Sequence, residues 1–130
     1  MISLPITSIS ALLGGLIIFL LTIKVTRMRR REGIGLGDHN HRPLTKAIRG
    51  HANAVEQLPI ALILMGLAEL QGAYTLLLAF CAVVLLIGRA LHGCYFAFDG
   101  TRWRLRVVGM GLTLIAQAAL LVALLLALIT

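Results

Sequence analysis

Long runs without charge alternate with short basic stretches along this chain. The first uncharged run extends from Ile2 to Ile23 and the last from Val107 to Thr130. Each is longer than the roughly 20 residues that an α-helix needs to cross the hydrocarbon of a membrane. Two further apolar segments lie between them, separated by the turn Gln71-Gly72. The pattern predicts one domain over residues 1–130 with four transmembrane helices, at about residues 3–27, 44–70, 73–98 and 106–129.

The composition agrees with lipid as the solvent of this chain. Hydrophobic residues make up 59% of the sequence, and its mean hydropathy is +0.96. A soluble domain of this size has too much surface for its volume to hide so much apolar area. A cleaved signal peptide is not expected, because no Lys or Arg precedes the first run and several follow it. We therefore predict an all-α integral membrane protein, a four-helix bundle.

The distribution of basic residues predicts how the protein is oriented in the membrane. All 12 Lys and Arg residues lie either between Lys24 and Arg49 or between Arg89 and Arg106. Four helices place these two stretches on one side of the membrane, so the positive-inside rule predicts cytoplasmic basic loops and both termini outside. The net charge of +7 would also suit nucleic acid, but an aromatic content of 5% is too low for a base-stacking surface. Membrane lipid, and not nucleic acid, is the expected partner.

Two other features predict no special chemistry. Cys81 and Cys94 lie in or beside one apolar run without a CxxC motif, so we expect small buried apolar residues and no metal site. The segment from Glu32 to Pro43 is rich in Gly, Asp and Asn and is expected to be a loop. Its glycines follow no strand, so they do not indicate a nucleotide-binding motif.

Arg49, Asn53 and Glu56 carry the first candidate chemistry. Their spacing of i, i+4 and i+7 places them on one face of a helix. A guanidinium binds carboxylates, an amide donates and accepts, and a carboxylate binds an amine. Together they suit a zwitterionic or peptide-like ligand. The alternative is an Arg–Glu ion pair that holds helices together.

A second polar face is expected on the third helix, from Arg89, His92 and Phe96 at i, i+3 and i+7. The structural alternative is an interhelical hydrogen bond from His92 and an Arg89 side chain that reaches the lipid headgroups. The basic clusters at 29–31 and 102–106 also have two interpretations. They either set the orientation and contact anionic lipid, or bind a ligand carboxylate or thiolate.

These residues together resemble the MAPEG family, the membrane-associated proteins of eicosanoid and glutathione metabolism. The resemblance covers essentially the whole chain and is closest to the short bacterial members, which implies a bacterial inner membrane. It implies a bundle that forms homotrimers, with glutathione as a co-substrate bound between neighbouring subunits near the cytoplasmic side. The motifs that carry it are Arg49-x-His51-x-Asn53-x-x-Glu56-x-x-Pro59, Gly88-Arg89-x-x-His92 and Arg106-x-x-Gly109-Met110.

The resemblance also implies roles for individual residues. Arg49 and Asn53 would hold carboxylate and backbone groups of glutathione, and Glu56 would bind the γ-glutamyl amine. The remaining implied glutathione-site residues are His51 in the motif, Arg29 approaching from a neighbouring subunit, Arg89 and His92 at the floor, and Phe96. Arg106 would stabilise the thiolate, with Arg104 as the alternative for that role.

The function implied is a glutathione-dependent transferase, with peroxidase activity as a further option. The thiolate would attack a lipophilic electrophile that enters from the bilayer. Phe96 and Gln57 stand where some eicosanoid enzymes of the family have tyrosine, which argues against a specific eicosanoid reaction. A catalytically silent binding or scaffold protein of the same fold is the alternative. A small multidrug transporter is disfavoured, because the first helix carries no carboxylate for coupling.

Overall fold

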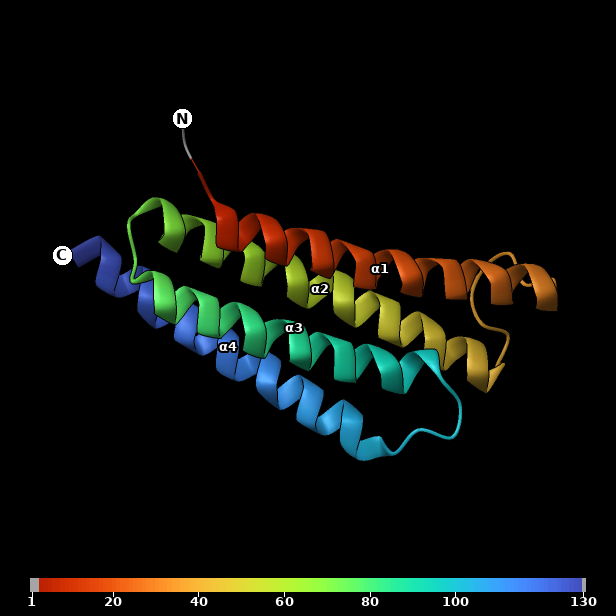
Figure 1. The fold of residues 1–130 in the computed structure, drawn as a ribbon. Helices are drawn as coiled ribbons and strands as arrows, with labels where there is room; N and C mark the ends of the chain where they lie inside the picture. Colours follow the sequence, from red (N-terminus) through yellow and green to blue (C-terminus); the bar gives the residue numbers. More distant parts are fainter. Residues whose placement is uncertain (1–2, 130) are drawn as a thin grey trace.

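The computed structural model describes residues 3–129, and within them it contains four helices and no strand (Figure 1). All four are long and apolar enough to cross a membrane. Ile2 and Thr130, the outer ends of two predicted apolar runs, lie outside the described residues. The helices are α1 (Pro5–Glu32), α2 (Arg42–Leu70), α3 (Thr75–Ala97) and α4 (Trp103–Ile129).

The first helix continues beyond its predicted end near residue 27. Arg29, Arg30 and Arg31 form its last turn, where straight-chain basic residues favour the helix and interact well with its dipole. The helix ends at Gly33, whose φ of 66° is left-handed and whose N–H donates to the Arg29 carbonyl. The second helix begins at Arg42, earlier than expected, because proline is well tolerated in a first turn.

The topology gathers the basic stretches at one end of the bundle. Figure 1 shows both termini and the α2–α3 turn at one end, with the α1–α2 and α3–α4 loops at the other. Over the described residues, α1 packs against α2 and α3, and α4 packs against the same two helices. No contact joins α1 to α4 within residues 3–129. α1 and α4 therefore lie on opposite sides of the α2–α3 pair.

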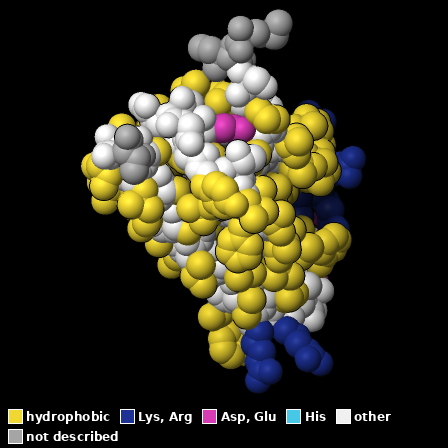
Figure 2. Space-filling view, turned by 60° about the vertical axis from the view of Figure 1, so that its left-hand side comes forward, with side chains coloured by type: hydrophobic (Ala, Val, Ile, Leu, Met, Phe, Trp, Pro, Cys, Tyr) yellow, Lys and Arg dark blue, Asp and Glu magenta, His cyan; other side chains and the backbone are white. Residues whose placement is uncertain are grey.

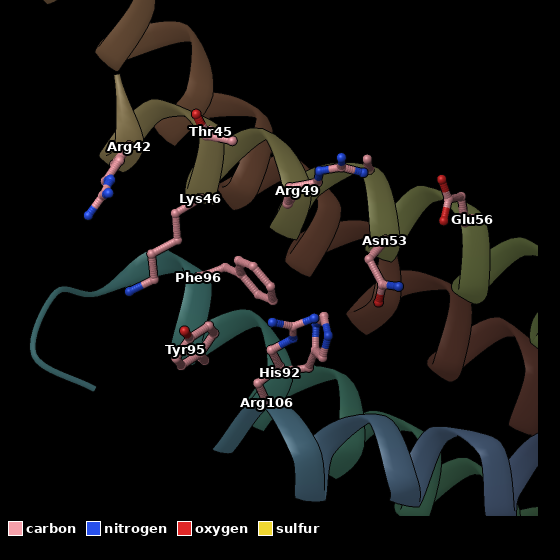
Figure 3. Close-up of a pocket in the computed structure, with 11 residues that line it drawn as sticks. Arg42, Thr45, Lys46, Arg49, Asn53, Glu56, His92, Tyr95, Phe96 and Arg106 are labelled. Atoms are coloured by element: carbon pink, nitrogen blue, oxygen red, sulfur yellow. The ribbon is translucent and has the colours of Figure 1, made fainter. Parts of the chain in front are cut away.

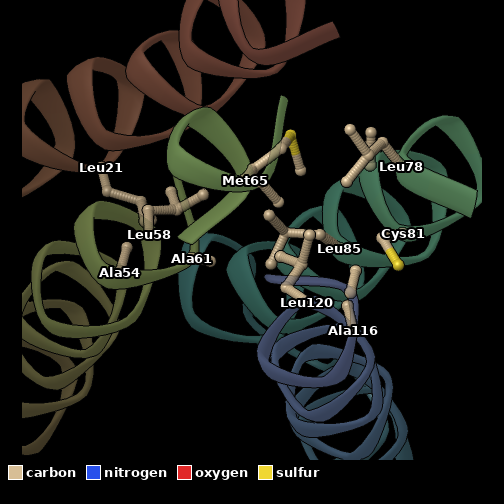
Figure 4. Close-up of a cluster of buried hydrophobic side chains, with 13 residues drawn as sticks. Leu21, Ala54, Leu58, Ala61, Met65, Leu78, Cys81, Leu85, Ala116 and Leu120 are labelled. Carbon is tan, nitrogen blue, oxygen red and sulfur yellow. The ribbon is translucent and has the colours of Figure 1, made fainter. Parts of the chain in front are cut away.

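The bundle core is formed by side chains from all four helices. Leu58, Met65, Leu85 and Leu120 are fully buried there (Figure 4), and α2 stays helical through Pro59. The outside is also apolar: Figure 2 shows hydrophobic side chains over most of one face, with Lys and Arg only near its margins. This is the surface expected of a protein whose solvent is lipid.

The two cysteines differ in their surroundings. Cys81 is buried in the core, as expected, whereas Cys94 is exposed. The expectation for Cys94 was wrong because it lies two residues after the inward-facing His92, and two residues turn a side chain to the opposite side of a helix.

Glycines set the helix spacing around the polar residues. A Cβ atom added at Gly88 of α3 would lie 2.8 Å from the Gly109 carbonyl oxygen of α4, and one added at Gly109 would lie 2.6 Å from the Gly88 oxygen. Gly50 of α2 packs in the same way against the Phe96 side chain. Only glycine allows these approaches. They bring α2, α3 and α4 together at the end of the bundle that carries the basic loops.

Candidate functional site

A cavity of about 560 Å³ lies between α2, α3 and α4 near the basic loops (Figure 3). Its size is in the range usual for small-molecule sites. Its lining is polar on the α2 side and aromatic on the α3 side. The lining residues are Arg42, Thr45, Lys46, Arg49, Ala52, Asn53 and Glu56 from α2, His92, Tyr95 and Phe96 from α3, and Arg106 from α4.

The α2 wall is one stripe of the helix. Arg42, Lys46, Arg49, Asn53 and Glu56 recur at steps of three or four residues, which is the spacing of one helical face. At 1.5 Å per residue, the stripe is about 21 Å long from Arg42 to Glu56. Figure 3 shows these two residues at opposite ends of the row.

Three charged side chains of this wall have no partners. Within residues 3–129, no hydrogen bond or ion pair engages the side chains of Arg42, Arg49 or Glu56. The structure therefore contains no Arg49–Glu56 ion pair of the kind that the sequence left open. An unpaired carboxylate and unpaired guanidinium groups beside one cavity are available to a ligand.

Arg89 lies behind this wall and does not line the cavity. Its side chain is 1% exposed. Nη1 donates to Asn53 Oδ1 at 2.8 Å, Nε donates to Thr113 Oγ1 at 2.8 Å, and Nη2 lies 3.6 Å from Met110 Sδ. One interpretation of the sequence was that Arg89 reaches toward the lipid headgroups, and this interpretation was wrong. Because it occupies the Asn53 oxygen, it leaves the Asn53 NH₂ group as the donor that is free to bind a ligand.

The α3 side of the cavity is a packed set of rings. The His92 and Phe96 ring centroids are 4.9 Å apart, and Tyr95 meets Phe96 edge-on at the same distance. His92 is buried, yet no hydrogen bond joins its ring to another described residue, so the interhelical bond of the structural alternative is not present. Arg106 enters from α4, with its guanidinium carbon 5.7 Å from the Phe96 centroid.

The sequence interpretation missed one part of the lining, namely Arg42, Thr45, Lys46, Ala52 and Tyr95. The Lys46 ammonium lies 4.6 Å from the Tyr95 ring centroid and donates to the Phe98 carbonyl at 2.9 Å. The signal for the α2 members was the same helical spacing that identified Arg49. Helical spacing does not identify Tyr95, because this residue points about 100° away from Phe96 on an ideal helix, yet the cavity is wide enough to reach both.

Four of the residues that the sequence suggested lie outside the cavity lining: Arg29, His51, Arg89 and Arg104. Arg29 binds its own loop, donating from Nη1 to the Gly37 carbonyl at 2.8 Å. Arg104 does not line the cavity, whereas Arg106 does. Of the two arginines considered for the thiolate, only Arg106 is placed at the site.

The loop before α2 fixes where the stripe begins. Asp38 accepts a hydrogen bond from the Thr45 hydroxyl at 2.7 Å and one from the Asn40 N–H at 3.1 Å. These bonds, chiefly the one from Thr45, hold the pKa of Asp38 below its ordinary value. His41 Nδ1 accepts from the Leu44 N–H at 3.3 Å and caps α2. The start of α2, which carries Arg42 and Lys46, is therefore ordered.

The charge of the cavity indicates the ligand. Arg42, Lys46, Arg49 and Arg106 supply four cations, and Glu56 supplies one carboxylate. Such a site favours a ligand with net negative charge and one amine. Among the described residues, no group of three or more His, Cys, Asp or Glu could hold a metal ion.

Comparison with known proteins decides the family. The sequence profile of the MAPEG family matches residues 7–126. The chain belongs to the MAPEG family. It is also 36% identical over 118 residues to inner membrane protein YecN of Escherichia coli strain K12, covering 91% of this chain and 88% of the relative. YecN of Escherichia coli O6:H1, strain CFT073, matches equally. The chain is thus a four-helix membrane protein of a family associated with eicosanoid and glutathione metabolism.

Proposed function

We propose that this protein is a glutathione-dependent transferase of the bacterial inner membrane. The observation that supports this most is the meeting of Arg49, Asn53, Glu56 and Arg106 around one cavity. None of the three ionised groups has a charged partner within the described chain. Leaving such groups unpaired near a membrane is costly, and this cost indicates that a ligand completes them.

Glutathione has groups that match the cavity. Its amine pairs with the Glu56 carboxylate, and a carboxylate takes the Arg49 guanidinium. The Asn53 NH₂, oriented by Arg89, donates to a backbone carbonyl of the tripeptide. Glutathione carries two carboxylates and one ammonium, so its net negative charge fits the excess of cations.

Arg106 would act on the sulfur. A guanidinium beside a thiol stabilises the thiolate and so increases the concentration of the nucleophile. In the reaction, the sulfur–carbon bond forms, the leaving group departs with the bonding electron pair, and the thiol proton passes to solvent. The apolar flanks of the helices let a lipophilic electrophile reach the thiolate from the bilayer.

A homotrimer fits this proposal. Arg49 and Glu56 are exposed in the single chain, on the flank of α2 that α1 does not cover. A neighbouring subunit on this flank would close the cavity and exclude water from the thiolate. In the same proposal the basic loops face the cytoplasm, where glutathione is abundant.

Binding tests the site first. Calorimetry in neutral detergent should show glutathione binding to the native protein and at least tenfold weaker binding to Glu56→Gln, because a charge-assisted bond is lost. Glu69→Gln is the matched control, since Glu69 lies at the other end of α2. No binding by the native protein would remove the proposal.

Turnover tests the chemistry. The native protein should conjugate 1-chloro-2,4-dinitrobenzene, and Arg106→Ala should lower kcat by roughly 10²–10³, as for loss of one stabilising donor. Arg104→Ala is the matched control, because that side chain lies outside the cavity lining. Glutathione binding without turnover on a panel of electrophiles and hydroperoxides would instead identify a silent member of the family.

A further inference from the structure

The outer part of the cavity is not explained by glutathione. We propose that Arg42, Lys46 and Tyr95, which we call the mouth subsite, bind an anionic group on the electrophile. This inference rests on the proposed transferase function and names the class of acceptor: a planar electrophile that carries a carboxylate or sulfonate.

The length of the α2 stripe supports two subsites. Along the helix, Lys46 lies about 15 Å and Arg42 about 21 Å from Glu56. Three fully extended residues span at most about 11 Å, and a γ-glutamyl link adds only a few bonds. Figure 3 shows the Lys46 and Arg42 side chains extending away from Glu56. A tripeptide whose amine is held at Glu56 therefore leaves both cations to another ligand.

The charge of the mouth subsite is uncompensated. No carboxylate among residues 3–129 lies within ion-pair distance of Arg42 or Lys46. The nearby Asp38 carboxylate accepts from the Thr45 hydroxyl and the Asn40 N–H, and it forms no ion pair with either cation. An anion is the group that this pair of cations would bind most strongly.

The mouth subsite is also preorganised. The Lys46 ammonium is held by the Phe98 carbonyl and by the Tyr95 ring, and two of its three N–H donors remain for a ligand. Tyr95 and Phe96 form an edge-to-face pair on which a planar ring can pack. Arg106 lies over the Phe96 ring, with its guanidinium carbon 5.7 Å from the ring centroid. An aryl electrophile on this pair would have its anionic group at Lys46 and its reactive carbon toward the Arg106-stabilised sulfur.

Two matched electrophiles test this inference: 4-chloro-3,5-dinitrobenzoate, which is anionic, and the neutral 4-chloro-3,5-dinitrobenzamide. In both, the sulfur–carbon bond forms, the carbon–chlorine bond breaks, chloride leaves with the electron pair, and the thiol proton passes to solvent. The readout is the ratio of kcat/KM for the anion to that for the amide, each divided by its uncatalysed rate with glutathione.

We expect this ratio to fall about tenfold in Lys46→Gln and in Arg42→Gln, as for loss of a charge-assisted contact. Arg30→Gln removes an exposed cation outside the cavity lining and should leave the ratio unchanged. A ratio that is the same in the native protein and in both mouth variants would overturn the inference while leaving the transferase intact.

Binding of the products supplies a readout that does not need turnover. The glutathione conjugate of the benzoate should bind about tenfold more tightly than that of the benzamide, and Lys46→Gln should abolish the difference. Equal affinities in the native protein would overturn the mouth subsite alone. Failure of both conjugates and of glutathione itself to bind would overturn the proposed function.

Discussion

Arg89 donates to the Asn53 side-chain oxygen at 2.8 Å and thereby joins α3 to α2 at the back of the cavity. This bond engages the Asn53 side-chain oxygen and leaves the NH₂ group of the same amide for the ligand. It also gives a fully buried guanidinium one of its few polar partners, because the others are the Thr113 hydroxyl and a methionine sulfur.

Asn53→Leu should therefore destabilise the protein as well as weaken ligand binding. Removing the acceptor leaves a buried cation short of a partner, which costs about 1–3 kcal/mol. The measurement is thermal unfolding in detergent without glutathione. Gln71→Leu, at an exposed position with a φ of −80° that leucine adopts without strain, is the comparison that should change little. An unchanged melting temperature for Asn53→Leu would show that Arg89 does not depend on this bond.

The close approach of α3 and α4 predicts a sharp contrast between two glycines of the bundle. Gly88→Ala places a methyl group against the backbone of α4, and overpacking of this kind costs about 1–3 kcal/mol. Gly111→Ala meets nothing within 4 Å and should be neutral or stabilise the helix by about 0.5–1 kcal/mol. Unfolding of the two variants in the same detergent makes the comparison. Equal stability would mean that the helices separate without penalty.

Glu69 caps a helix to which it does not belong. Its carboxylate oxygens accept from the N–H groups of Ile6 and Thr7, at 3.0 and 2.9 Å, at the start of α1. Loss of such a cap costs about 0.5–2 kcal/mol. Glu69→Ala should thus speed hydrogen exchange at these two amides, while Glu56→Gln should leave it unchanged. Slow exchange in Glu69→Ala would show that another group, or the membrane interface, caps α1.

Acid should loosen the loop before α2. The pKa of Asp38 is lowered in the folded protein, mainly by the Thr45 hydroxyl. The ionised carboxylate therefore contributes stability at pH values above its ordinary pKa, and this contribution is lost as the pH falls through the lowered folded value. NMR titration of the Asp38 carboxyl carbon should give a midpoint below the ordinary value. The midpoint should move back toward that value in Thr45→Val, and a midpoint unaffected by this change would contradict the assignment.

The orientation proposed from the basic loops can be tested with single cysteines. In a variant without Cys81 and Cys94, Gly35→Cys should react with an impermeant maleimide only after the membrane is opened. Gln71→Cys, at the exposed start of the short α2–α3 turn, should react in intact cells. The physical reason is the cost of moving basic loops across the membrane during insertion. The reverse pattern of labelling would invert the topology.

The number of helices and their transmembrane character were predictable, because the length and apolar character of each run are enough to identify a span. The face formed by Arg49, Asn53 and Glu56 was predictable for a similar reason, since all three lie on one helix. The place of Arg89 was not, because it depends on how α3 is rotated against α2 and α4. That rotation is set by the contacts that Gly50, Gly88 and Gly109 make with neighbouring helices. The spacing of residues along a single helix gives no information about such contacts.

The contact between Gly88 and Gly109 is made by main-chain atoms, so α3 and α4 have little freedom to slide against each other. His92 lies one turn beyond Gly88, and Arg106 lies nearly one turn before Gly109. A bilayer that thins or thickens would tilt α3 and α4 together as one rigid unit. The distance between His92 and Arg106 would then stay unchanged.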